Sequence, residues 1–160
     1  MKQPRFPLRI NVGFLVHQPI GTYRDIHFEY PQLSIPPDFS IEQFSGVVRI
    51  SRTPQGLIFQ GEFRGNHQEE CVRCLAEFSQ PLQTSFSELF AFTERSVTDS
   101  ELLVPEDGNV DLDPLVREYL LLEVPIRPLC RPDCKGLCIE CGEDLNVRTC
   151  EHVKRPINQP

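Results

Sequence analysis

The 160-residue sequence has no long hydrophobic run and has fewer basic than acidic residues. Nothing approaches the length of a membrane-spanning helix. The apolar run Val12–Val16 is interrupted by Gly13 and is too short for the core of a secretion signal. Lys and Arg total 16 against 23 Asp and Glu, so the formal net charge is −7, which does not favour non-specific attraction to phosphate backbones. We therefore expect neither a membrane protein, nor a secreted protein, nor a strongly basic nucleic-acid-binding protein.

The common catalytic motifs are also missing. The sequence has no serine-centred nucleophile elbow, no glycine-rich loop that cradles phosphate and no Asp-rich metal motif. His17, His27 and His67 have no partner at the spacing of ligands or bases, so each is expected to be an ordinary surface or strand residue. We therefore expect a protein that is not an enzyme and has no small-molecule substrate.

Seven cysteines and one nearby histidine are the most informative residues that are present. They form two Cys-x-x-Cys pairs, one Cys-x3-Cys pair and one Cys-x-His pair, with the members Cys71, Cys74, Cys130, Cys134, Cys138, Cys141, Cys150 and His152. Cys and His at short local spacings are the usual ligands of four-coordinate zinc. Eight donors suffice for two closed sites, so we expect one or two Zn²⁺ ions as the cofactor. The Cys-x-His end fits zinc better than an iron–sulfur cluster.

Three alternatives remain, two of which replace zinc binding and one of which changes only the role of the bound metal. A disulfide framework needs an oxidising compartment, which the start of the chain does not indicate. A thiol redox protein or sensor using Cys71 and Cys74 is the second alternative, because Arg73 would lower a thiol pKa. Against it, the strand and helix that flank a thioredoxin-like motif are missing. A zinc-stabilised protein–protein adaptor or metal-storage module is the third.

The spacing does not settle which residues share an ion. The preferred partition places Cys71, Cys74, Cys130 and Cys134 on one ion, and Cys138, Cys141, Cys150 and His152 on a second. The alternatives are a site of Cys130, Cys134, Cys138 and Cys141, or a ribbon of the two Cys-x-x-Cys pairs with the other residues free. Each arrangement is closed to water, which favours structural over catalytic zinc. Gly142 permits a positive φ after the second Cys-x-x-Cys pair, whereas Leu75 follows the first.

Alternating apolar and polar residues predict an α+β fold that is mainly antiparallel β-sheet, with one short helix and a zinc-bound, Cys-rich C-terminal segment. A β-hairpin is predicted where residues 48–52 and 57–63 flank the turn Thr53-Pro-Gln-Gly56. Further strands are expected at 8–12, 23–35 and 78–92, the last with a bend at Pro81. Asp111 as N-cap and Pro114 in the first turn predict a helix over 112–123.

We expect a single domain over residues 1–152. It comprises antiparallel β structure in 1–93, an acidic loop in 94–111, the helix in 112–123 and the Cys-rich zinc segment in 126–152, and a disordered tail follows in 153–160. Residues 1–125 contain 10 Lys and Arg against 18 Asp and Glu, whereas 126–160 contain 6 against 5. The basic residues of this second part are candidate RNA contacts, although they would also offset the charge of zinc-bound thiolates: Arg127, Arg131, Lys135 and Arg148.

The chain resembles the YceD-like family of large ribosomal RNA subunit accumulation proteins of bacteria and plastids. The resemblance rests on Cys71-Val-Arg-Cys74-Leu75, the acidic loop, the short helix and the segment Cys130–Asn146, and it extends from about Phe44 to His152. The matching residues are Cys71, Cys74, Cys134, Cys138, Cys141, Gly142, Leu145, Asn146 and Cys150. Family members commonly end in Cys-x-Cys, where this chain has Cys150-Glu-His152, and histidine can replace that ligand.

The resemblance implies a YceD-like domain with a non-enzymatic role. It implies that the protein supports accumulation of the large-subunit (23S) ribosomal RNA, in ribosome assembly. The implied partners are that RNA, a ribosomal protein, or both, with no membrane. The implied location is the bacterial cytoplasm or the plastid stroma.

Overall fold

The computed structural model describes residues 5–154, and the chain divides into two compact units. Unit 1 consists of Met1–His67 and Pro81–Glu123, and unit 2 of Gln68–Gln80 and Val124–Pro160. Of the expected disordered tail, residues 155–160 lie outside the described residues, while Val153 and Lys154 belong to the 3-10 helix η2 (Glu151–Lys154).

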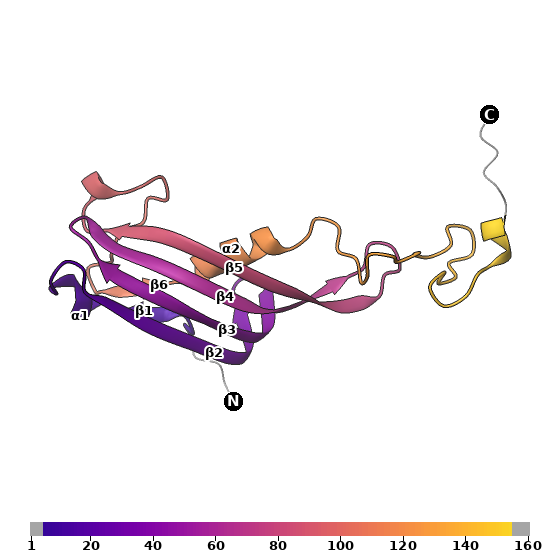
Figure 1. Cartoon of the computed structure of the whole chain (residues 1–160), viewed down its shortest axis with the longest axis horizontal. Coiled ribbons are helices and arrows are strands. Elements are labelled where there is room, and N and C mark those ends of the chain that lie inside the picture. The colour runs from indigo at the N-terminus through magenta and orange to yellow at the C-terminus, as the bar shows by residue number, and fades with distance from the viewer. Residues whose placement is uncertain (1–4, 155–160) are drawn as a thin grey trace. The chain divides into compact units, whose positions relative to one another are not determined.

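A four-stranded sheet dominates the fold (Figure 1). Its strands are β2 (Tyr23–Ile35), β3 (Phe39–Arg52), β4 (Gly56–Glu70) and β5 (Glu77–Ala91), and they lie in the order β2-β3-β4-β5. The pairs β2–β3 and β3–β4 are antiparallel. The predicted hairpin is confirmed with its turn at Thr53–Gly56, where the Thr53 N–H donates to the Gly56 carbonyl over 2.9 Å. The structure thus confirms the mainly antiparallel fold class.

The core of unit 1 follows from the alternation in the strands. On β4, Leu57, Phe59 and Phe63 are buried, while Ile58, Gln60 and Glu62 are more exposed. Aromatic rings continue this core from strand to strand: the ring centroids of Phe44 and Phe63 lie 5.3 Å apart, and those of Phe63 and Phe86 lie 5.9 Å apart. Each buried Phe contributes on the order of 2 kcal/mol of transfer free energy, so unit 1 has a hydrophobic core of its own.

One helix, α2 (Asp113–Glu123), lies close to the predicted range. Its start is fixed by Asp111, whose Oδ1 accepts the backbone N–H of Asp113 over 3.0 Å. Val116 and Leu120 are buried, and the Tyr119 ring lies 5.2 Å from that of Phe86 on β5. The helix therefore covers one face of the sheet. Within residues 5–154, no helix has the length and apolar character needed to cross a membrane.

Strand β1 (Arg9–Asn11) lies within the strand predicted at 8–12. It pairs antiparallel with β6 (Asn109–Asp111), which was not predicted and lies inside the segment expected to be an acidic loop. The four-residue helix α1 (Gly13–Val16) and the 3-10 helix η1 (Glu94–Ser96) complete unit 1. The predicted bend at Pro81 does not interrupt β5, which is one continuous strand.

Candidate metal centre

The first Cys-x-x-Cys pair sits in the turn between β4 and β5. The Cys71 N–H donates to the Ala76 carbonyl and the Leu75 N–H donates to the Cys71 carbonyl, both over 2.9 Å, which closes a tight loop around the two sulfurs. Leu75 completes the turn with a φ of 59°. A further bond from the Val72 N–H to the Pro128 carbonyl, over 3.0 Å, ties this turn to the segment that carries Cys130.

Cys71, Cys74, Cys130 and Cys134 form what we term the first cluster. Their sulfur atoms all lie within 4.8 Å of one another. The Sγ atoms of Cys71 and Cys134 are 3.8 Å apart, and those of Cys74 and Cys130 are 3.7 Å apart. All seven cysteines, each in the described part of the chain, are free of disulfide bonds.

These separations fit a tetrahedral zinc ion. With Zn–S bonds of about 2.3 Å, the edges of a regular tetrahedron measure roughly 3.8 Å. Cys71 and Cys134 are fully or almost fully buried, with 0% and 2% of their surface exposed. Four sulfurs within 4.8 Å of one another, two of them buried, match the donor set of a closed structural site.

The electrostatics of the first cluster also favour a cation. The backbone N–H of Cys130 lowers the pKa of the Cys71 thiol to about 6, against the opposing effect of burial. In contrast, burial and the neighbouring sulfurs, Cys74 first among them, raise the pKa of Cys130 to about 12. One thiolate is therefore stable without metal, but four together are not. A divalent ion removes this repulsion, because it is bound by the thiolate forms.

Asn146 fixes the first cluster from outside. Its Nδ2 donates to the Cys134 sulfur over 3.4 Å and to Oδ1 of Asp144 over 2.8 Å, and its Oδ1 accepts the Lys135 N–H over 2.8 Å. Such a donor partly neutralises a metal-bound thiolate and orients it. Asn146 is one of the residues that carry the family resemblance, but the sequence predicted no role for it. A hydrogen bond between residues twelve positions apart leaves no signal in local spacing.

Arg73 and Gly136 complete this support. Nη1 of Arg73 donates to the Cys134 carbonyl over 2.8 Å, and the Arg73 carbonyl accepts the Leu137 N–H over 2.9 Å. Gly136 has a φ of +77°, and a Cβ there would lie 2.9 Å from the Arg73 carbonyl oxygen. A glycine is therefore required where the two segments of unit 2 meet.

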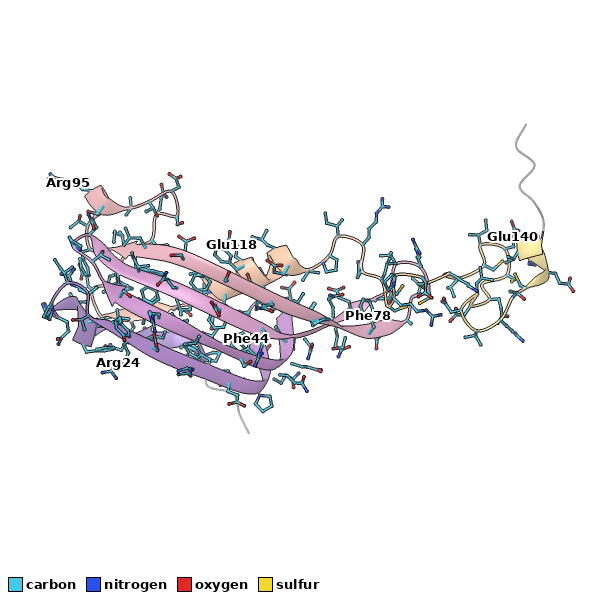
Figure 2. The ribbon with its side chains drawn as sticks, viewed as in Figure 1. Arg24, Phe44, Phe78, Arg95, Glu118 and Glu140 are labelled. Atoms are coloured by element: carbon cyan, nitrogen blue, oxygen red, sulfur yellow. The ribbon has the colours of Figure 1, made fainter. Side chains whose placement is uncertain are left out.

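Cys138, Cys141, Cys150 and His152 form the second cluster, whose ligand atoms also lie within 4.8 Å of one another. The chain reverses between the first two: the Gly142 N–H donates to the Cys138 carbonyl and the Cys138 N–H to the Glu143 carbonyl, both over 2.8 Å. Gly142 has a φ of +74° with no atom near its missing Cβ, so it serves the turn alone. Glu140, labelled in Figure 2, lies in this turn.

The second cluster resembles the first in electrostatics but not in burial. The backbone N–H of Cys141, followed by that of Glu140, lowers the pKa of Cys138 to about 7. For Cys141, the Glu143 N–H favours the thiolate, but burial and the adjacent Cys138 outweigh it and raise the pKa. Cys138 is buried, whereas Cys141 and His152 are exposed to solvent. Three thiolates and one imidazole again match four-coordinate zinc.

The structure therefore groups the eight candidate ligands as in the preferred partition. Cys138 and Cys141 do not join Cys130 and Cys134, and the two Cys-x-x-Cys pairs do not form one ribbon.

The four candidate RNA contacts are all exposed. Two of them face acidic side chains of the same unit: Arg148 forms a two-pronged ion pair with Glu143 at 2.6 and 2.7 Å, and Arg131 lies 3.6 Å from Asp133. Arg127 and Lys135 have no acidic partner within residues 5–154. These two are the side chains that remain available to an external anion.

Comparison with known proteins identifies relatives of the Cys-rich part. The family model described as large ribosomal RNA subunit accumulation protein YceD matches residues 59–160. An uncharacterized protein of Mycobacterium tuberculosis is 32% identical over 102 residues, which cover 61% of this chain and 49% of that protein. The uncharacterized protein YlbN of Bacillus subtilis is 31% identical over 90 residues, covering 55% and 52%.

A third relative carries a functional name. The chloroplastic large ribosomal RNA subunit accumulation protein YCED homolog 1 of Arabidopsis thaliana is 38% identical over 47 residues, which cover 29% of this chain and 15% of that protein. The chain spans about half the length of the bacterial relatives it matches. No solved structure matches it significantly. Since the family model covers well over half of the sequence, including all eight cluster residues, the chain belongs to the YceD family.

Proposed function

We propose that this protein is a non-enzymatic factor that supports accumulation of the large-subunit (23S) ribosomal RNA in ribosome assembly, with structural zinc in both clusters. The observation that carries the proposal is the family match, which spans the two four-donor clusters. The bacterial relatives and the chloroplastic relatives support a location in the bacterial cytoplasm or the plastid stroma.

The small amount of apolar burial in unit 2 supports the presence of zinc. Its large aliphatic side chains are mostly exposed: Ile126, Ile139 and Val147 have 99%, 96% and 79% of their surface accessible. A segment with so little apolar burial needs another source of order, and structural zinc supplies on the order of 10 kcal/mol of apparent folding free energy in small domains.

A role without catalysis is supported by the way the donors are used. Each cluster supplies four ligands, so a bound ion has no open position for water or substrate. A redox enzyme would need an accessible attacking thiol. Cys71 has the lowered pKa but is 0% exposed, which disfavours the redox alternative.

Unit 2 is the better candidate for the RNA-facing part. It contains 7 Lys and Arg against 8 Asp and Glu, whereas unit 1 contains 9 against 15. Repulsion of phosphate is therefore weaker at unit 2, and Arg127 and Lys135 are exposed there without an acidic partner among the described residues. A small contact with RNA, or one with a ribosomal protein bound to it, agrees with this balance.

The experiment measures metal, RNA and thiols in the same strains. In a host lacking its own copy, the wild-type chain should restore the 23S to 16S ribosomal RNA ratio and carry two zinc ions by native mass spectrometry. Cys74→Ser, which breaks the first cluster, should carry one zinc ion and fail to restore the RNA ratio. A wild-type chain without zinc, or a Cys74→Ser variant that restores the RNA ratio fully, contradicts the proposal.

Thiol alkylation separates the redox alternative. The zinc-loaded protein should resist alkylation at Cys71 and Cys74 until a chelator is added. Rapid alkylation of both in the loaded protein, with reversible disulfide formation, would favour a redox protein instead.

A further inference from the structure

Unit 1 carries a groove that the Cys-rich clusters do not use. The groove, termed the α2 groove, has a volume of about 710 Å³ and lies between α2 and the turn at Pro36 and Pro37. Its apolar walls include Phe6, Leu121 and Leu122, with 42%, 38% and 73% of their surfaces exposed. Three carboxylates and two guanidinium groups also line it, those of Asp111, Asp113 and Glu118 and those of Arg5 and Arg117, and Glu118 is labelled on α2 in Figure 2. The groove therefore combines exposed apolar surface with a small excess of negative charge.

Asp113 has an unmet hydrogen-bonding need in this groove. The residue is only 6% exposed, and its Oδ1 is buried with no hydrogen-bond partner within residues 5–154. Burial, reinforced by the nearby charge of Asp111, raises the pKa of this carboxyl to about 6, although the Leu8 N–H partly opposes the shift. A buried carboxylate oxygen without a hydrogen-bond donor lowers the stability of the free chain. A bound partner that supplies a donor would remove this cost.

Arg117, one turn along the helix, has the opposite need. Its Nη2 donates to Oδ1 of Asp38 over 2.7 Å, but its Nε–H is buried with no acceptor within the described range. An acceptor-seeking N–H and a donor-seeking carboxylate thus line the same groove. Both atoms are buried in the free chain, so an incoming segment reaches them only if side chains around them change rotamer, which is common at interfaces.

The geometry points to an extended basic polypeptide segment of a partner protein as the occupant of the α2 groove. A Lys or Arg side chain of the segment donates to Asp113, and a backbone carbonyl accepts from Arg117. Apolar residues beside the cation contact Phe6, Leu121 and Leu122. Only a polypeptide supplies all three groups along one chain. Nucleic acid is disfavoured because the carboxylates of the groove outnumber its guanidinium groups, and Arg117 is already paired with Asp38.

The charge of unit 1 supports this choice. The unit contains 15 Asp and Glu against 9 Lys and Arg, so it attracts a cationic segment from a distance and repels an anionic one. The inference goes beyond the proposed function and uses no metal ligand, so it stands or falls independently of the zinc clusters.

The test is a binding titration with the full-length, zinc-loaded chain. The probe is a short fluorescent peptide that alternates arginine with leucine, compared with the same peptide carrying glutamine for arginine. Asp113→Asn should weaken binding of the arginine peptide by about ten- to a hundredfold, since a charge-assisted hydrogen bond is lost. Asp99→Asn, an equal loss of charge at an exposed residue outside the groove, should change it by less than about twofold.

A second pair of variants covers the case in which Asp113→Asn fails to fold. Leu122→Gln removes apolar contact at the rim and should weaken binding several-fold. Ile20→Gln alters a similarly exposed aliphatic residue elsewhere in unit 1 and should have no effect.

Four results would overturn the inference. The first is absence of binding to the arginine peptide. The second is equal weakening by Asp113→Asn and Asp99→Asn, which indicates diffuse charge attraction. The third is binding of labelled single-stranded RNA to the chain that Leu122→Gln weakens and Ile20→Gln does not, which assigns the surface to nucleic acid. The fourth is a large gain in peptide affinity on deletion of residues 2–4, which assigns the groove to the chain's own N-terminal segment.

Discussion

Asn146 is the residue whose side chain joins metal ligand and backbone most directly. It donates to the Cys134 sulfur and holds the Lys135 N–H. Asn146→Ala should lower zinc affinity at the first cluster by ten- to a hundredfold, the usual effect of removing an outer hydrogen bond to a ligand. Competition with a chromophoric chelator measures this loss.

Two variants sharpen the Asn146 prediction. Asn146→Asp keeps an acceptor for Lys135 but loses the donor and adds charge beside the thiolate, so it should be at least as damaging as alanine. Asn66→Ala removes a side-chain bond of 2.8 Å to Gln43 in unit 1 and should leave zinc affinity unchanged. Equal zinc retention in all three variants would refute a role for Asn146 at the metal.

Leu75 and Gly142 occupy equivalent positions after the two Cys-x-x-Cys pairs. Both have positive φ, 59° and 74°, which a non-glycine residue adopts at a cost of roughly 1 kcal/mol. Leu75→Gly should therefore raise the unfolding free energy of the loaded protein by up to about 1 kcal/mol, since the leucine is 57% exposed and little burial is lost. Gly142→Ala should lower it by a similar amount, and chemical denaturation measures both. A destabilising Leu75→Gly would show that the leucine side chain is itself needed.

Asp113 makes stability depend on pH. Its carboxyl has a pKa of about 6 in the folded chain against 3.8 for an ordinary Asp, so between these values the unfolded state releases a proton that the folded state retains. The contribution of Asp113 to stability is therefore intact below about pH 4 and is lost as pH rises through about 6. Asp113→Asn should be more stable than the wild type at neutral pH, by on the order of 1 kcal/mol, and equal to it near pH 4. Urea unfolding at both pH values tests the sign.

At the level of elements, the two clusters are unequal. The first cluster contains two buried sulfurs, whereas the second exposes Cys141 and His152. A chelator should therefore remove the ion of the second cluster first, and alkylation should reach Cys138 and Cys141 before Cys71 and Cys134. Native mass spectrometry during a chelator titration should pass through a one-zinc species. A direct step from two ions to none would show that the sites are cooperative instead.

Single-ligand variants assign that one-zinc species. His152→Ala should hold one ion and His152→Cys two, because a thiolate replaces the imidazole as fourth ligand. Two retained ions in His152→Ala would remove His152 from the ligand set.

The sequence predicted the sheet and the helix because their signals are local. Alternation in residues 48–63, with Pro54 and Gly56 at the turn, defines β3 and β4, and Asp111 with Pro114 marks the start of α2. Alternation in residues 8–12 likewise predicted β1, but its partner β6 was missed, because a three-residue strand carries little alternation and pairs with β1 only across about a hundred residues. The acidic residues beside β6 instead indicated a solvated loop.

For the candidate site, the sequence predicted the ligands but not the contacts that bring them together. Cys and His spacing named all eight donors, but several partitions remained open, since spacing carries no information on which distant pairs meet. The structure supplies that through the contact of Val72 with Pro128 and of Arg73 with Leu137. The α2 groove could not be predicted from the sequence either, because its walls come from three separate stretches around Phe6, Pro36 and Leu121.

At the scale of the whole molecule, the two units owe their order to different physics. Unit 1 has a buried aromatic and aliphatic core that includes Phe44, Phe59 and Phe63. Unit 2 has exposed aliphatic residues, several isolated backbone hydrogen bonds and two clusters of side chains that could hold a metal ion. Folding of unit 2 is therefore expected to depend on metal binding, whereas folding of unit 1 is expected to be independent of metal.

Hydrogen exchange with and without zinc measures this division. Removal of zinc should increase exchange in residues 68–80 and 126–152, including the N–H groups of Cys71, Leu137 and Cys138, which donate backbone hydrogen bonds in the structure. Strands β2 and β3 should keep their protection, because their ladder and core contain no metal ligand. The ends of β4 and β5 that belong to unit 2 should exchange with the clusters, so the boundary falls within two continuous strands, near His67 and Pro81. Loss of protection throughout β2 and β3 on zinc removal would mean that the chain folds as one cooperative unit, and unchanged protection in 126–152 would mean that zinc does not order the Cys-rich segment.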